Sequence, residues 1–230
     1  MISGEVWAHL DCVAAGPALN MAWDEALLER AGERQCPVFR SYGWTEPCAT
    51  FGYFQRWADV SRWTDQRPLV RRPTGGGLVS HAQDWTYSLA VPPSHAWYGW
   101  SAVESYQCLH RWIQAAFDRL GVVTELAPCC QPEGPGRCFI GAEKFDLLWR
   151  GGKVAGAAQR RNRLGLLIQG SIQPPPDGLP RAAWESAMRM AASEGAGVRW
   201  EPLKPGLVLE QRVTDLATTK YASEDYRRLR

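Results

Sequence analysis

The sequence predicts a single α+β domain spanning residues 1–230, built of largely antiparallel sheets with flanking helices. Short apolar segments have the pattern of strands, longer segments repeat their apolar residues at helical spacing, and most strand segments are joined by hairpins. The composition, with 45% hydrophobic and 22% charged residues, is that of a globular protein. We find no repeat, low-complexity tract or linker that would divide the chain.

Apolar residues recur at helical spacing in three segments, residues 19–30, 101–120 and 180–194. The second segment is the clearest helix, because Ser101 and Glu104 form a capping box at its start. A short basic helix is expected at the end of the chain.

Strand-like segments lie between these helices and are bounded by glycine, proline and polar residues. They are residues 38–42, 49–53, 85–91, 122–127 and 164–172. The clearest hairpin covers residues 145–159, where Gly151 and Gly152 separate two apolar runs and suit a tight turn with positive φ. Residues 131–137 hold two prolines and two glycines and therefore form a loop, so Cys138 follows at a loop-to-strand junction.

Composition and charge exclude several classes of function. No apolar run reaches the 18 or so residues of a membrane span, and the first residues lack a secretory signal pattern, so we expect a cytoplasmic protein. Seven cysteines without a regular framework suit free thiols in a reducing compartment. A net charge of +2 is too small to indicate a nucleic-acid partner, and we expect a monomer.

The segment RRPTGGG, residues 71–77, leaves a predicted strand with three consecutive glycines. Glycines let the backbone approach a ligand closely, and backbone N–H groups in such a turn can bind a carboxyl, phosphate or acyl carbonyl group. A bend or bulge is the commoner role of such glycines. The segment is not a P-loop, because no Gly-Lys-Ser/Thr follows.

Lys153 follows the Gly-Gly turn and is succeeded by the small residues Gly156, Ala157 and Ala158. A lysine beside a turn is most often a solvated surface residue. The small residues favour a binding role instead, because they leave the strand surface open to a bound chain.

Cys138 is a candidate nucleophile. A thiol is only slightly ionised at neutral pH, so a nucleophilic cysteine needs a nearby cation or base, and Lys153 is the candidate to supply that charge. A lone cysteine is more often a small buried hydrophobic residue. No zinc-ligand spacing, His-Glu-x-x-His or Gly-x-Ser-x-Gly motif occurs, so we predict neither a metal site nor a serine hydrolase.

Taken together, these segments resemble the biotin/lipoate protein ligase family, above all its octanoyltransferases and lipoate–protein ligases. The matching segments, in chain order, are residues 20–25 (NMAWDE), 38–44 (VFRSYGW), 52–55 (GYFQ), 71–77 (RRPTGGG), His81 with 86–88 (TYS), Cys138-Phe139 with 145–147 (FDL), 153–159 (KVAGAAQ) and 170–172 (GSI). The resemblance implies the catalytic fold shared with biotin ligases (biotin synthetase-like) and class II aminoacyl-tRNA synthetases. It also implies that Lys153 corresponds to the family's invariant lysine.

The resemblance further implies catalysis by Cys138 and Lys153, facing each other across an acyl slot. The substrate-binding residues it implies are Arg72, Thr74, Gly75, Gly76, Gly77, His81, Gly156, Ala157, Ala158 and Gly170. An octanoyl or lipoyl group would pass from acyl carrier protein to Cys138 as a thioester, and then to a lysine of a lipoyl domain or glycine-cleavage carrier protein. Such a transfer needs no cofactor.

Other activities remain open within this resemblance. A lipoate ligase would instead need ATP and Mg²⁺, a lipoyl amidotransferase would move the group between two lipoyl proteins, and a module without activity would bind only the acyl group or carrier. Cys138 lies fifteen positions before Lys153, as in one octanoyltransferase class, and the chain ends at Arg230 with little room for an accessory domain. Both points favour transfer over ligation.

Two positions depart from the family's pattern. Ala82 stands where relatives have the aspartate of a His-Asp pair, and Gln169 stands where they often have histidine. We expect these changes to affect carrier docking, acyl length or adenylate binding, or to mark a divergent or inactive member.

Overall fold

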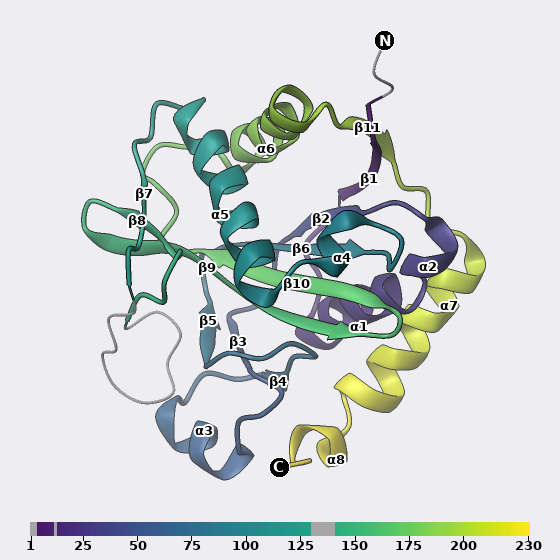
Figure 1. Cartoon of the computed structure of the whole chain (residues 1–230). Helices are drawn as coiled ribbons and strands as arrows, with labels where there is room; N and C mark the ends of the chain where they lie inside the picture. Colours follow the sequence, from purple (N-terminus) through teal and green to yellow (C-terminus); the bar gives the residue numbers. More distant parts are fainter. Residues whose placement is uncertain (1–3, 12, 130–140) are drawn as a thin grey trace.

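The computed structural model describes residues 4–11, 13–129 and 141–230 (Figure 1). The predicted loop 131–137 and Cys138 lie outside these residues. Within them, no helix combines the length and apolar character needed to cross a membrane.

A large mixed sheet forms the centre of the molecule (Figure 1). Its strands, in spatial order, are β11 (Arg199–Pro202), β1 (Val6–Asp11), β2 (Val38–Tyr42), β6 (Trp85–Val91), β10 (Gly165–Ile172), β9 (Gly152–Asn162), β8 (Leu147–Trp149) and β7 (Glu125–Leu126). The two pairings of β1 are parallel, and the others in this sheet are antiparallel. The predicted class of largely antiparallel α+β fold is therefore confirmed.

A second, smaller sheet lies beside it and carries the glycine-rich segment. Its strands are β4 (Leu69–Arg71), β3 (Cys48–Phe51) and β5 (Val79–His81), with β3 in the middle. Helix α3 (Trp57–Trp63) covers this sheet, and Val60 of the helix packs into a core with Phe51 and Leu69.

Helices cover both faces of the large sheet (Figure 1). On one face lie α5 (Ala102–Asp118) and α6 (Arg181–Ala196), and on the other lie α1 (Pro17–Glu29) and α7 (Leu207–Leu216). Side chains along strand β6 point alternately to the two faces of the sheet. Tyr87 and Leu89 pack in the core under α5 and α6, whereas Ala90 packs in the core under α1 and α7. The shorter helical elements are α2 (Ala31–Arg34), α4 (Ala96–Gly99), α8 (Glu224–Arg227) and a π-helical turn (Ala217–Tyr221).

The sequence prediction succeeds where the local signal is strong. Strands β2 and β6 have the predicted bounds, and the Ser101–Glu104 capping box starts α5 as expected. The short helix predicted at the end of the chain is α8.

The hairpin turn is displaced by one residue. The two positive φ angles fall on Arg150 (51°) and Gly151 (78°), and Gly152 already opens β9. Positive φ at both central residues is what a type I′ turn requires, and Arg150 adopts it although it is not glycine.

Other predicted ends were also wrong. The strand expected at residues 122–127 is reduced to β7, and α6 continues past Gly195 to end at Ala196, with Gly197 as its C-cap at φ +67°. Strands β1 and β11 and helix α7 were not among the elements expected from the sequence.

The two edges of β9 are paired over different lengths. Strand β10 pairs with β9 as far as Asn162, whereas β8 pairs with it only through Ala155 within the described chain. Beyond that point, side chains satisfy part of the open edge: the Ala157 amide donates to the Tyr106 hydroxyl of α5 at 3.2 Å. Within the described chain, the part of β9 beyond Ala155 is thereby held to α5 rather than to β8.

Candidate active site

A pocket lies between the two sheets, over strands β9 and β10. It encloses about 460 Å³ of empty volume, part of which is open to solvent. The lining residues predicted from sequence are Arg72, His81, Lys153, Gly156, Ala157, Ala158 and Gly170. The structure therefore brings residues from β5, β9, β10 and the start of the glycine-rich segment to one cavity.

The floor of the pocket is made of small residues on two paired strands. Gly156 pairs with Ser171, and Ala157 pairs with Gly170. Because neither pair carries a bulky side chain, the sheet surface is open to an extended apolar ligand.

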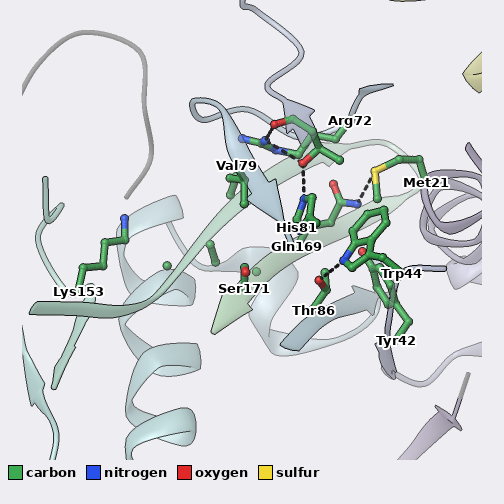
Figure 2. Close-up of a pocket in the computed structure, with 15 residues that line it drawn as sticks. Met21, Tyr42, Trp44, Arg72, Val79, His81, Thr86, Lys153, Gln169 and Ser171 are labelled. Carbon is green, nitrogen blue, oxygen red and sulfur yellow. Dashed lines mark hydrogen bonds between the residues drawn. The ribbon is translucent and has the colours of Figure 1, made fainter. Parts of the chain in front are cut away.

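Lys153 lies at one end of the pocket, apart from the other labelled side chains (Figure 2). Its ammonium Nζ is 2.7 Å from Oδ2 of Asp146, and the two side chains are 8% and 0% exposed. The Glu143 amide also donates to Asp146 Oδ2, at 2.6 Å, and the Tyr106 hydroxyl donates to Oδ1. A fixed cation at the end of an open slot can stabilise negative charge that develops on an acyl carbonyl.

The glycine-rich segment is held by backbone contacts. The Arg72 guanidinium donates from Nε and Nη2 to the Gly75 carbonyl, at 3.0 and 2.5 Å. Gly76 has φ +81°, and its carbonyl oxygen lies only 1.9 Å from where a Cβ of Gly52 would be. Glycine is thus required at position 52 by the close approach of two backbone segments, and it is favoured at position 76 by the positive φ angle.

Thr74 and the three glycines, although predicted to bind substrate, are not among the residues that line the pocket. Thr74 is fully buried, and its hydroxyl donates to Oε1 of Gln169 at 2.7 Å. Among the arginines, Arg71 is also buried and donates to the carbonyls of Tyr53, Gln55, Tyr226 and Arg227.

Gln169 connects this segment to α1. Its Nε2 donates to Asp24 Oδ2 at 2.6 Å, while its Oε1 accepts from Thr74. Asp24, fully buried, also accepts from Arg40 and Tyr42 of β2. The residue that departs from the family's pattern therefore uses both ends of its amide in a buried polar network, where an unmatched group would be costly.

His81 is fixed by a second network. Its Nδ1 lies 2.9 Å from Asp84 Oδ2, its Nε2 lies 2.8 Å from the Thr50 hydroxyl, and its ring stacks on Trp44 with centroids 4.1 Å apart. Ala82 lacks a carboxylate, and the structure places that of Asp84 against the imidazole instead.

The charge of Asp84 is supported by the same contacts. Burial raises the pKa of Asp84, but the charge of His81 and hydrogen bonds from His81, Ser171 and Thr86 outweigh burial and hold that pKa below its ordinary value. The carboxylate therefore stays ionised at neutral pH.

Several lining residues were missed as site residues by sequence reasoning. They are Met21, Tyr42, Trp44, Thr50, Val79, Thr86, Gln169 and Ser171. Most lie in segments that had been matched to the family, but no local spacing shows that β2, β3 and β10 meet at one cavity. Figure 2 shows Met21, Tyr42, Trp44 and Gln169 grouped at the end of the pocket opposite Lys153.

The predicted nucleophile Cys138 lies outside the described residues, so its approach to Lys153 stays a prediction. Within residues 4–11, 13–129 and 141–230, no group of three or more His, Cys, Asp or Glu side chains could hold a metal ion.

The sequence is similar to those of known octanoyltransferases. The chain is 36% identical over 184 residues to octanoyltransferase LipM of Anoxybacillus flavithermus and 35% identical over 181 residues to that of Bacillus subtilis. Each match covers 73% of this chain and 65% of the relative, so the similarity spans a little under two thirds of those proteins.

Solved structures show the same fold at low sequence identity. Protein Ta0514 from T. acidophilum superposes with a TM-score of 0.78 at 17% identity, covering 100% of both chains. Lipoate-protein ligase A bound with ATP superposes with a TM-score of 0.76 at 18% identity, covering 98% of both chains.

The family comparison covers most of the chain and includes the glycine-rich segment, Lys153 and the pocket floor. Residues 16–195 match the lipoyl protein ligase A/B catalytic domain. The chain therefore belongs to the lipoyl protein ligase A/B catalytic domain family.

Proposed function

We propose that this protein is an acyltransferase that moves an octanoyl or lipoyl group from acyl carrier protein to a lysine of a lipoyl domain. The observation that carries the proposal is a buried cation, Lys153, at the end of a slot with a floor of small residues, in a chain similar to octanoyltransferases. Such a slot suits an unbranched acyl chain, whose carbonyl would lie at the lysine end.

The proposed reaction has two steps through Cys138. The Cys138 thiolate attacks the thioester carbonyl of the acylated carrier, the carbon–sulfur bond to the carrier breaks, and the carrier's pantetheine sulfur leaves as a thiol with the proton that Cys138 lost when it became a thiolate. The ε-amine of the acceptor lysine then attacks the new thioester, forms the amide and releases Cys138, while the proton lost by the amine goes to the departing sulfur. Splitting the transfer in this way consumes no nucleotide.

Lys153 contributes charge in both steps. A cation near the thiol favours the thiolate, and the same cation stabilises the oxyanion of each tetrahedral intermediate. Gly156 and Gly170 expose backbone along the path of the acyl chain, and Arg72 fixes the adjacent glycine-rich segment.

The proposal includes the setting of the reaction. The partners are acyl carrier protein as donor and a lipoyl domain or glycine-cleavage carrier protein as acceptor, and transfer requires no cofactor. We place the reaction in the cytoplasm, because seven cysteines without a regular framework suit free thiols in a reducing compartment, and we expect a monomer.

An ATP-dependent lipoate ligase is the second candidate, since lipoate-protein ligase A, whose structure was solved with ATP, has the same fold. A lipoyl amidotransferase uses the same thioester chemistry with a lipoyl protein as donor. A carrier-binding module would bind the acyl group and transfer nothing.

One assay separates these candidates. A lipoyl domain is incubated with the protein and with octanoyl carrier protein, with lipoate plus ATP and Mg²⁺, or with an octanoylated glycine-cleavage carrier protein. We expect acylation with the first donor in the absence of ATP. Acylation only with lipoate and ATP, with release of pyrophosphate, would identify a ligase and refute the transfer proposal.

A further inference from the structure

The carboxylate beneath Lys153 has no role in the reaction as proposed. Asp146 is fully buried, and its two oxygens together contact the Lys153 ammonium, the Glu143 amide and the Tyr106 hydroxyl. A buried carboxylate with this many donors is held in one orientation, and it holds its partners in turn.

Gly156 provides the space in which the Lys153 side chain lies. A Cβ at Gly156 would be 2.6 Å from Cε and 2.8 Å from Nζ of Lys153, and 3.2 Å from Asp146 Oδ1. The side chain of Lys153 therefore runs along β9 and lies over the backbone of Gly156, three residues further on, where no side chain is in the way. Any side chain at this position would displace the ammonium.

Helix α5 fixes the other side of the carboxylate. The Tyr106 hydroxyl donates to Asp146 Oδ1 while accepting from the Ala157 amide, so one side chain joins the helix, the carboxylate and the pocket floor. Burial, followed by the charge of Asp146, raises the pKa of Tyr106 well above its ordinary range. Tyr106 thus remains a neutral donor.

Among the described residues, His110 of α5 and Tyr87 of β6 are further titratable groups that interact with the pair. Burial lowers the pKa of His110 to about 4, so this imidazole is neutral at physiological pH. Burial, followed by the charge of Asp146, raises the pKa of Tyr87 above its ordinary range. The described groups Tyr106, His110 and Tyr87 around Asp146 are therefore uncharged at neutral pH. The positive charge that pairs with the carboxylate is that of Lys153.

We infer that Asp146 is the positioning residue that holds the Lys153 ammonium over Gly156, so that Lys153 acts as a fixed cation at the end of the pocket. The carboxylate oxygen Oδ2 lies 2.7 Å from Nζ, and this buried ion pair fixes where the ammonium can lie. The catalytic consequence rests on the proposed transfer; the placement of the lysine does not.

The first test uses Asp146→Asn and Asp146→Glu. We expect Asp146→Asn to lower kcat by about 10²-fold with little change in KM, as for a misplaced catalytic group. Asp146→Glu keeps the charge of the carboxylate and should recover part of the rate.

The second test alters the space without touching either charge. Gly156→Ala should reduce kcat by displacing the ammonium, with the fold retained, since the clash is with the end of a flexible side chain. Gly152→Ala on the same strand is the matched control. The nearest atom to its Cβ would be the Trp149 carbonyl oxygen at 3.8 Å, so we expect its rate to equal that of the wild type.

The third measurement needs no acyl transfer. Each protein is treated briefly with acetic anhydride at pH 8, and acetylation of Lys153 is quantified by mass spectrometry against an exposed lysine, Lys204, as internal reference. We expect Lys153 to react about tenfold faster in Asp146→Asn and Gly156→Ala than in the wild type or Gly152→Ala, because a buried, ion-paired ammonium is a poor nucleophile.

The readouts separate the two proposals. Faster labelling in both variants, together with wild-type protein that transfers no acyl group, would support the placement by Asp146 and reject the transferase. Unchanged labelling and an unchanged kcat in folded Asp146→Asn would overturn the inference.

Discussion

Replacing Gln169 with leucine tests how the glycine-rich segment is attached to the body of the protein. In the native chain the Gln169 amide accepts from Thr74 and donates to Asp24, and all three side chains are buried. Leucine has a similar size but leaves the Thr74 hydroxyl without this acceptor, which costs about 1–3 kcal/mol. Asp24 keeps its bonds from Arg40 and Tyr42, so its loss is about 1 kcal/mol.

The expected total for Gln169→Leu is therefore about 2–4 kcal/mol of unfolding free energy. For a chain of this length that corresponds to a fall in Tm of roughly 5–15 °C. Differential scanning calorimetry and urea unfolding would measure both quantities. The matched control is Gln211→Leu, because Gln211 is exposed on α7 and bonds only to exposed Asp215 among the described residues. We expect its change to be within about 0.5 kcal/mol.

A loss of stability below 1 kcal/mol for Gln169→Leu, equal to that of the control, would refute this reasoning. It would mean that the network around Asp24 does not hold the segment. Because the segment packs against the pocket, we also expect acyl transfer to weaken in this variant even at temperatures where it is folded.

Two further predictions concern packing and pH. Gly170→Ala would place a Cβ 2.1 Å from the buried Tyr87 hydroxyl, so we expect the free energy of unfolding to fall by at least about 3 kcal/mol, or no folded protein. Gly195→Ala in α6, whose Cβ would have no described atom within 4 Å, should instead raise the free energy of unfolding by about 0.5–1 kcal/mol. Equal unfolding midpoints for the two variants would contradict this. The lowered pKa of Asp84 adds stability above its unfolded pKa, and that contribution is lost as the pH falls through the folded pKa, so the difference in urea midpoint between wild type and Asp84→Asn should be large at pH 7 and shrink below about pH 4. A difference that stays constant across this range would show that Asp84 acts by shape alone.

Local patterns in the sequence were sufficient for much of the fold. Strand β6 (WTYSLAV) is mostly apolar or aromatic and is buried throughout, and the capping box at Ser101 is a contact between neighbours in the chain. Strands β1 and β11 were not predicted, because they are held by parallel pairing between residues almost two hundred positions apart, such as Trp7 and Trp200. Such pairing leaves no signal within a short window of sequence.

The site was only partly predictable for the same reason. The glycines at 75–77 suggested an open turn, but the need for glycine at Gly52 comes from its contact with the Gly76 carbonyl, which no local pattern shows. Gln169 was recognised as unusual, yet its two partners lie in other segments. In contrast, the small residues after Lys153 pointed correctly to an open strand surface, since alternation on one strand is a local property.

The central claim is that an acyl group rests on a sulfur of this protein before it reaches the acceptor lysine. Intact-protein mass spectrometry after mixing with octanoyl carrier protein, without acceptor, tests it most directly. The account predicts one octanoyl adduct per chain, mapped to Cys138, absent from Cys138→Ala and discharged when a lipoyl domain is added. Full acylation of the lipoyl domain by Cys138→Ala, with no adduct in the wild type, would contradict it.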